Sequence, residues 1–152
     1  MRIRIEATDL PGRTCPPGDG FPGYSGIHVG VQRRDRPGEI LDLHPGDAAT
    51  ARWTLDCTVT TTAEGSADIR GPYVQGRPGG RFVYLCWGTL DAAGGFAVFR
   101  RAKLMLDRLE PDLIEAAIGS GTLVGRLGLT DAQGRPLCAA VRPPVIAWSP
   151  AP

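Results

Sequence analysis

The chain has 152 residues, the size of one ordinary domain, and such a chain can bury roughly 70% of its unfolded surface in a single core. Its formal net charge is +1, from 17 basic and 16 acidic residues, so no overall field attracts nucleic acid or an anionic membrane. The 21 glycines and 14 prolines favour many turns and few long helices. We therefore expect a single, turn-rich domain with no nucleic acid and no membrane among its partners.

The four cysteines, Cys15, Cys57, Cys86 and Cys138, are too far apart in the sequence for the close pairs that zinc sites and redox centres use. No stretch resembling a signal peptide follows Met1, and no apolar run approaches membrane-spanning length. We expect a cytoplasmic protein with buried, reduced thiols. Two disulfides, which the even count allows, are the less favoured alternative because cytosolic disulfides are rare.

Alternation of apolar and polar residues predicts the strands of the first half of the chain. One strand begins at Arg2 and ends near Leu10, a second covers residues 26–34, and the clearest covers 51–60. A Pro/Gly-rich loop separates the first two at 11–26, and a short apolar segment lies at 39–43.

In the second half, residues 68–72 and 76–80 have the composition of turns, and residues 81–87 are apolar on both faces, as in a central strand. The segment 96–106 contains good helix formers, but the glycine-rich turn before it favours a hairpin strand. We prefer the strand.

Pro111 begins a short helix that we expect to cover about residues 111–119, with glycines at its end. Strands at 122–130 and 137–141, joined by a turn at 131–134, precede a final apolar segment at 145–148 and a Pro-rich tail. The predicted fold is mainly β, either an antiparallel β-sandwich or a partly open β-barrel, with this one helix at one end.

One polar group stands out as a candidate ligand site. Guanidinium groups and the amides of the Gly76–Gly80 turn could together bind a carboxylate or phosphate, beside aromatic side chains. The candidate residues are Tyr73, Gln75, Arg81, Tyr84, Arg100 and Arg101, with His28 as a polar group on a neighbouring strand. The alternative is that these arginines point into solvent and pair with Asp56, Asp68 or Asp91, which would stabilise the fold little.

Known catalytic and metal-binding patterns are missing from the sequence. His28 and His44 have no ligand or base at suitable spacing, so we predict no metal site, and no glycine motif predicts a nucleotide cofactor. Ser120 lies at a helix end rather than on a nucleophile elbow. Cys86, between Leu85 and Trp87, has the surroundings of an inert, packed thiol.

Four segments, 71–76, 81–84, 100–103 and 136–139, carry a family resemblance. With them the chain resembles, over nearly its whole length, an uncharacterised family of small bacterial, mainly actinobacterial, proteins catalogued as a domain of unknown function. The resemblance implies a bacterial single-domain protein and implies no activity, cofactor or site.

The leading hypothesis is a small-molecule-binding or accessory protein without a cofactor, whose ligand is anionic or aromatic. A second hypothesis is a cofactor-free cyclase or isomerase that uses a pocket in the barrel, where Tyr84, His28 or Asp56 moves a proton. A third is a structural subunit that forms a homodimer through an exposed sheet edge.

Overall fold

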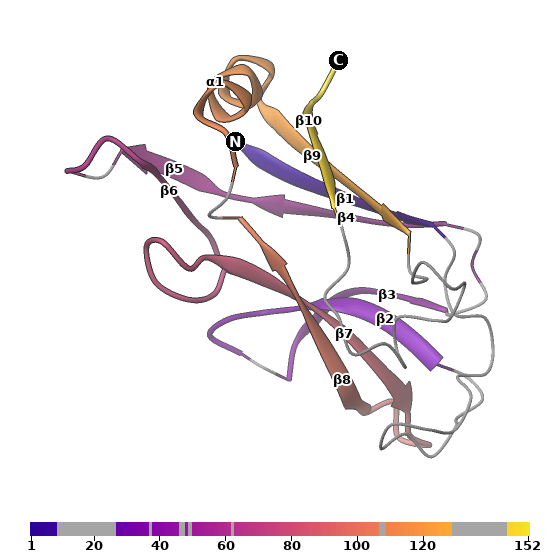
Figure 1. Ribbon diagram of the computed structural model, residues 1–152. Helices are drawn as coiled ribbons and strands as arrows, with labels where there is room; N and C mark the ends of the chain where they lie inside the picture. The colour runs from indigo at the N-terminus through magenta and orange to yellow at the C-terminus, as the bar shows by residue number, and fades with distance from the viewer. Residues whose placement is uncertain are drawn as a thin grey trace.

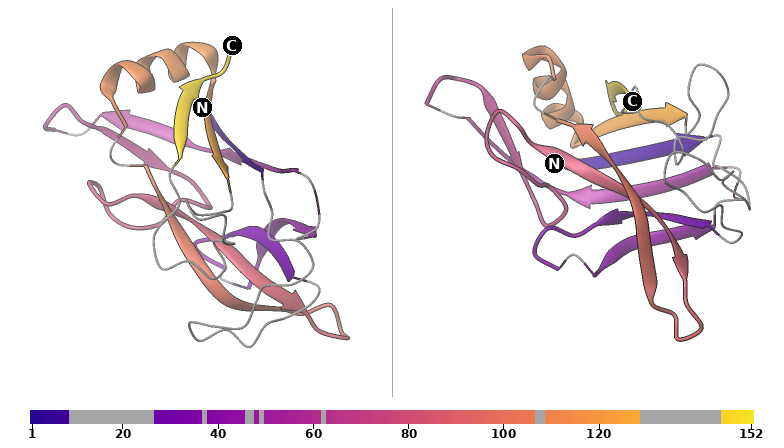
Figure 2. Two further views of the ribbon diagram at one scale, coloured as in Figure 1. Left: turned by 45° about the vertical axis from the view of Figure 1, so that its right-hand side comes forward. Right: turned by 60° about the horizontal axis from the view of Figure 1, so that its bottom comes forward.

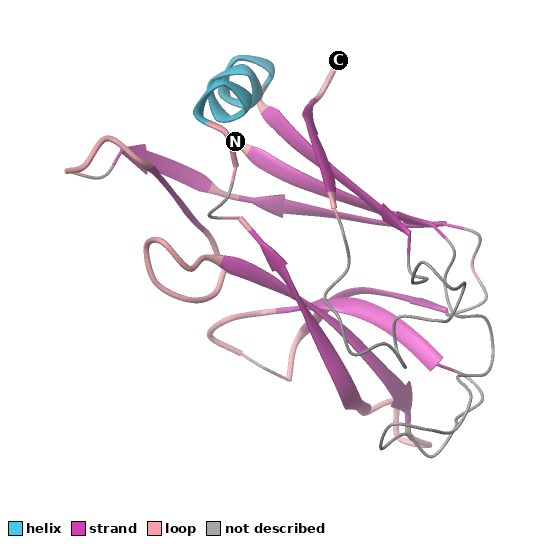
Figure 3. Ribbon diagram, viewed as in Figure 1, coloured by secondary structure: helices cyan, strands magenta, loops and turns pink. Residues whose placement is uncertain are grey.

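The computed structural model describes residues 1–8, 27–36, 38–45, 48, 50–61, 63–106, 109–128 and 146–152. In this part of the chain it contains ten strands and one helix (Figure 3). The predicted loop at 11–26, the turn at 131–134 and the strand at 137–141 lie outside the described residues.

The first sheet has four strands in the order β10-β9-β1-β4 (Figure 1). These are β1 (Arg2–Thr8), β4 (Thr50–Asp56), β9 (Thr122–Gly128) and β10 (Ala147–Pro150). β1 is antiparallel to β4 and parallel to β9, so the two ends of the described chain meet in one sheet.

The second sheet is antiparallel throughout, in the order β3-β2-β7-β8. It consists of β2 (Ile27–Gln32), β3 (Ile40–Pro45), β7 (Phe82–Leu90) and β8 (Phe96–Met105). The two sheets lie face to face (Figure 2), and in the part described neither closes into a barrel. The mainly β, sandwich-like prediction is therefore confirmed, and the segment 96–106 is a strand.

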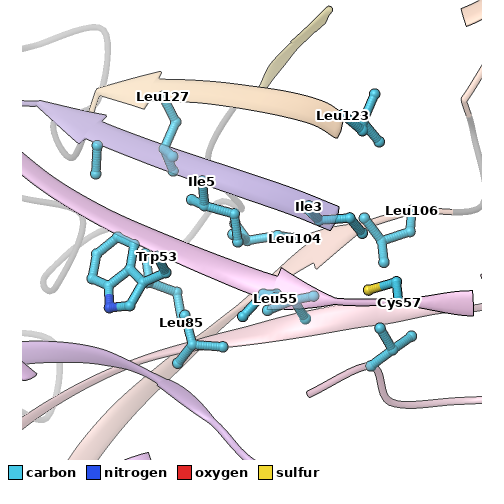
Figure 4. Close-up of a cluster of buried hydrophobic side chains, with 14 of the residues drawn as sticks. Ile3, Ile5, Trp53, Leu55, Cys57, Leu85, Leu104, Leu106, Leu123 and Leu127 are labelled. Atoms are coloured by element: carbon cyan, nitrogen blue, oxygen red, sulfur yellow. The ribbon is translucent and has the colours of Figure 1, made fainter. Parts of the chain in front are cut away.

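Side chains from both inner faces form the core (Figure 4). Ile3, Ile5 and Trp53 of the first sheet and Leu85 and Trp87 of the second are fully buried. Their spacing of two residues is what puts them on one face of each strand. Burying a side chain of this size contributes about 1.5–3 kcal/mol to the free energy of folding, so this layer supplies most of the free energy that favours the folded state.

A two-stranded ribbon, β5 (Thr58–Thr61) and β6 (Ala67–Arg70), continues from β4 and projects beyond the sandwich (Figure 1). The predicted single strand at 51–60 is thus β4 and β5, divided at Cys57. The expectation of a turn from residue 68 was wrong. In β6 Ile69 is the only large apolar residue, too weak a pattern to distinguish a strand from a turn.

The helix α1 (Pro111–Ser120) lies at the end of the first sheet where β1 begins (Figure 1), in agreement with the predicted helix. Pro111 is well suited to its first turn, because proline lacks the N–H that would have no partner there. Gly121 ends it with a left-handed φ of 78° and donates its backbone N–H to the Ile118 carbonyl. Among the described residues no helix is long and apolar enough to cross a membrane.

Candidate functional site

A hollow of about 320 Å³ lies between α1 and the ribbon β5–β6. We call it the helix–ribbon cleft. In Figure 2 the ribbon and the helix stand side by side at one end of the molecule, so the two elements form its walls. Its larger apolar side chains are Val59, Leu106, Leu109, Ile114 and Ile118, and the remaining lining residues are Thr61, Glu64, Gly65, Ser66, Ala67, Pro111 and Glu115.

The helix wall follows from the 3.6-residue repeat of α1. Pro111, Ile114, Glu115 and Ile118 are spaced i, i+3, i+4 and i+7, which places them along one stripe of the helix, and all four line the cleft. Ala117, on another side of the helix, is fully buried and belongs to the core. The apolar surface of α1 is therefore wider than the core alone requires.

The ribbon wall follows from strand register. Thr61 is paired with Ala67, and both line the cleft, as does Val59 on the same face. The chain leaving β8 contributes Leu106, which is buried, and Leu109. Two groups of residues thus meet here, one between positions 59 and 67 and the other between 106 and 118, and the two groups are far apart in the sequence.

Two further hollows adjoin the cleft. One, of about 570 Å³, shares Val59 and Ile118 with it and includes Met1, Arg2 and Cys57. The other, of about 200 Å³, shares Glu64, Ser66, Ala67 and Leu106 with it and extends to Arg81. The cleft is therefore the middle of a longer depression around the base of the ribbon.

Ile118 has an apolar side chain that lines the cleft and is exposed to solvent. Its side chain is 52% exposed, and Leu90, at 43%, is the other large apolar side chain that the described residues expose to this degree. Large apolar side chains exposed in a hollow are typical of a binding site, because a ligand can remove them from water.

Arg81, a predicted ligand residue, is turned inward. Its side chain is 10% exposed and its Nε donates to Asp68 Oδ1 at 3.0 Å, while another guanidinium nitrogen donates to the Gly76 carbonyl. Arg70 Nε approaches Asp68 Oδ2 at 2.6 Å. The hydrogen bond from Arg81, reinforced by Arg70, holds the pKa of the Asp68 carboxyl below its usual range although burial opposes this.

Tyr73 and Gln75 lie in the segment that Arg81 fastens to the ribbon. The backbone of Gln75 exchanges two hydrogen bonds with Phe82, of 2.8 and 3.1 Å. Tyr73 is half-buried against the core. Both residues thus help to close this loop onto the start of β7.

Tyr84, Arg101 and His28 share the outer face of the second sheet. Arg101 is opposite Cys86 and His28 is opposite Gly88, on the face to which Tyr84 also belongs by alternation. Arg100 is opposite Trp87, so it belongs to the other face. The structure brings three of the seven predicted residues onto one face and places Tyr73, Gln75 and Arg81 in the loop.

Three other side chains lie at or near that outer face and were not among the predicted ligand residues: Gln32, Phe82 and Lys103. Arg101 Nε donates to Oε1 of the buried Gln32 at 3.0 Å. Phe82 and Tyr84 are in edge-to-face contact, with ring centroids 4.8 Å apart, and Lys103 Nζ lies 4.5 Å from the Phe82 ring centroid. The alternation of side chains along β7 and β8 was the sequence signal from which their shared face could have been predicted.

Cys86 lies beneath these polar groups and is fully buried. Burial raises the pKa of its thiol to about 11, although Arg101 opposes the shift. The thiol is therefore protonated at neutral pH, as expected for a packing residue. Within the described residues, no group of three or more His, Cys, Asp or Glu side chains is placed to hold a metal ion.

The cleft itself was not predicted from the sequence. Ile114 and Ile118 were recognised only as helix residues, and the excess apolar width of α1 was the one signal available for it. Val59 and Leu106 gave no such signal, because only the tertiary fold brings them to α1.

Comparison with known proteins gives a family and no activity. Neither the curated proteins nor the solved structures include a match to the chain. The family model that does match covers residues 1–151, which is nearly the whole chain. This protein therefore belongs to DUF5990, a family of unknown function.

Proposed function

We propose that this protein binds a small molecule, and that the apolar part of the ligand occupies the helix–ribbon cleft. The observation that carries the proposal is the exposed Ile118 in a hollow of about 320 Å³, whose size lies within the range of small-molecule sites. A ligand there would cover apolar surface that the fold leaves open to water.

Part of the cleft is preformed. Leu106 in the floor and Ile114 in the helix wall are both buried in the protein without a ligand. A preformed site loses less conformational entropy on binding. Removing about 200 Å² of apolar surface from water gives about 5 kcal/mol, from which the entropy cost of association is subtracted, so we expect a Kd weaker than about 10⁻⁴ M for a simple apolar probe.

Fluorescence titration with the neutral apolar dye N-phenyl-1-naphthylamine tests the proposal. We expect saturable binding to the wild-type protein and about five- to tenfold weaker binding to Ile118→Gln, which makes the wall polar without adding charge. Leu90→Gln is the matched control, because Leu90 has similar exposure but lies outside the cleft.

Three results would contradict the proposal: no saturable binding, equal binding to all three proteins, or weakening by Leu90→Gln alone. Native mass spectrometry of the protein purified from its source, compared with the denatured sample, addresses the natural ligand. An excess mass that disappears on denaturation is the expected result. We expect a smaller fraction of the protein to carry this mass when Ile118 is replaced by glutamine (Ile118→Gln).

Three sequence-based predictions accompany this proposal. An anionic or aromatic ligand bound by the seven predicted residues, of which Tyr84, Arg101 and His28 share one face of the second sheet, stays a prediction. So do a bacterial source and a cytoplasmic location. The cleft is the stronger candidate because its lining includes an exposed apolar side chain in a defined hollow.

A further inference from the structure

The charged groups around the helix–ribbon cleft point to the chemistry of its ligand. We infer that this ligand is a cationic amphiphile, an apolar body that carries an ammonium group. The inference rests on the proposed function of the cleft, and it adds the ligand's charge and the residues that would recognise it.

Among the described lining residues, charge is of one sign only. Glu64, in the turn of the ribbon, and Glu115, on α1, are both exposed and come from opposite walls, and no lysine, arginine or histidine is among the described residues that line the cleft. An ammonium group at the mouth would thus meet a carboxylate on each side while the apolar body contacts Ile114 and Ile118. An anionic head group in the same place would be repelled by both carboxylates.

The helix extends this negative field beyond the lining. Residues 109–121 include Glu110, Asp112 and Glu115 and no basic residue, although the whole chain has a net charge of +1. The last turn of α1, where Ile118 lies, has no basic side chain to offset the partial negative charge of the helix C-terminus. The cleft is thus an acidic region on a nearly neutral protein.

Two described arginines near the cleft, Arg81 and Arg2, are already paired with carboxylates. Arg81, which lines the adjoining smaller hollow, is bound to Asp68. In the adjoining larger hollow, Arg2 Nε is 3.9 Å from an Asp56 oxygen. The ammonium of Met1 donates to the neutral Cys57 carbonyl at 3.1 Å and keeps its charge, but Met1 lines that larger hollow and not the cleft. The two ion pairs reduce the positive field of Arg81 and Arg2, and the carboxylates of Glu64 and Glu115 are the charged groups among the described lining residues of the cleft.

Three competitors with the same hydrocarbon chain separate charge from apolar burial. Octylamine, which is an ammonium ion at pH 7, 1-octanol and octanoate would each be used to displace N-phenyl-1-naphthylamine from the protein. We expect the ammonium to bind about three- to tenfold more tightly than the alcohol, and the alcohol more tightly than the carboxylate. The preference should shrink as NaCl is raised from about 20 mM to about 500 mM.

The double variant Glu64→Gln/Glu115→Gln should bring the three competitors to within about twofold of each other, with each competitor's affinity calculated from the variant's own affinity for the dye. Asp35→Asn/Glu39→Gln is the matched control: it removes two exposed carboxylates in the turn between β2 and β3, so the net charge changes equally, and the preference for the ammonium should persist.

Different results would overturn the proposed binding function and the inferred charge of the ligand. Absence of dye binding overturns the proposed function of the cleft itself. Dye binding without a preference for the ammonium, or a preference that survives the loss of Glu64 and Glu115, overturns the inference about charge and leaves the apolar site standing.

Discussion

Asp68 joins the ribbon to the loop before β7, and its carboxylate is the single acceptor shared by Arg70 and Arg81. The Asp68 residue is 3% exposed, so Asp68→Asn would leave the guanidinium of Arg81 buried without a countercharge. We expect the free energy of unfolding to fall by about 3 kcal/mol, measured by urea denaturation. The loss is near the lower end of the range for buried ion pairs because Arg70, the second partner of Asp68, is largely exposed to solvent.

The pH dependence of the same variant has a defined sign. The pKa of Asp68 is lower in the folded protein than in the unfolded chain, so its contribution to stability is present above the unfolded pKa and is lost as pH falls through the folded pKa. Wild-type stability should therefore decline more steeply in acid than that of Asp68→Asn. Asp56→Asn is the control, since Asp56 is 93% exposed and 3.9 Å from Arg2, and equal behaviour of the two variants would refute the assignment.

The two buried tryptophans of the core differ in their hydrogen bonds. Trp53 Nε1 donates to the Asp42 carbonyl at 2.9 Å, whereas Trp87 Nε1 has no partner within the described part of the chain. Replacing either with phenylalanine removes similar apolar volume, but Trp53→Phe also removes the hydrogen bond to the Asp42 carbonyl. We expect Trp53→Phe to cost about 0.5–1.5 kcal/mol more than Trp87→Phe in urea denaturation. An equal or larger cost for Trp87→Phe would show that its N–H has a partner after all.

At the scale of one element, α1 offers two neighbouring glycines with opposite expected effects. Gly121 has a φ of 78°, which an alanine adopts only under strain, whereas Gly119 has a helical backbone. A Cβ at either position would meet no atom within 4 Å, so backbone conformation alone decides the outcome. Gly121→Ala should lower the free energy of unfolding by about 1 kcal/mol, and Gly119→Ala should raise it by about 0.5–1 kcal/mol.

Thermal denaturation checks this pair of variants, with Tm falling for Gly121→Ala and rising for Gly119→Ala. Because the two changes add the same methyl group two residues apart, a shift of the same sign in both would mean that something other than the left-handed cap decides the end of α1.

Some elements of the fold could be predicted from the sequence and others could not. β1 and β4 were predictable because each buries one face, and α1 because Pro111 and the glycines after it mark its ends. β6 was not predictable, since it is short and gains its order from pairing with β5. The helix–ribbon cleft was hidden for the same reason: Val59 and Ile118 become neighbours only when the ribbon and α1 are both in place.

At the scale of the whole molecule, the protein is a sandwich with an attached ribbon. Each part contains one of the two described thiols, so thiol reactivity can compare how readily the two parts open. Cys57 lies between β4 and β5, at the base of the ribbon, whereas Cys86 lies in the central strand β7. Burial raises the pKa of each thiol from 9.0 to about 11, so each has about a hundredfold less thiolate near pH 8 than an ordinary cysteine. Each thiol also makes the fold less stable as pH rises from about 9 to 11, because the unfolded chain ionises first.

We therefore expect thiol labelling at pH 8 to distinguish the parts, in a Cys15→Ser/Cys138→Ser variant that keeps only Cys57 and Cys86. Cys57, which is 9% exposed, should react through local opening of the ribbon, at a rate that depends weakly on urea. Cys86, which is fully buried, should react through unfolding of the sandwich, more slowly and with a steep dependence on urea. Identical rates and slopes would mean that the ribbon and the sandwich open as one unit, and that the helix–ribbon cleft is as rigid as the core beneath it.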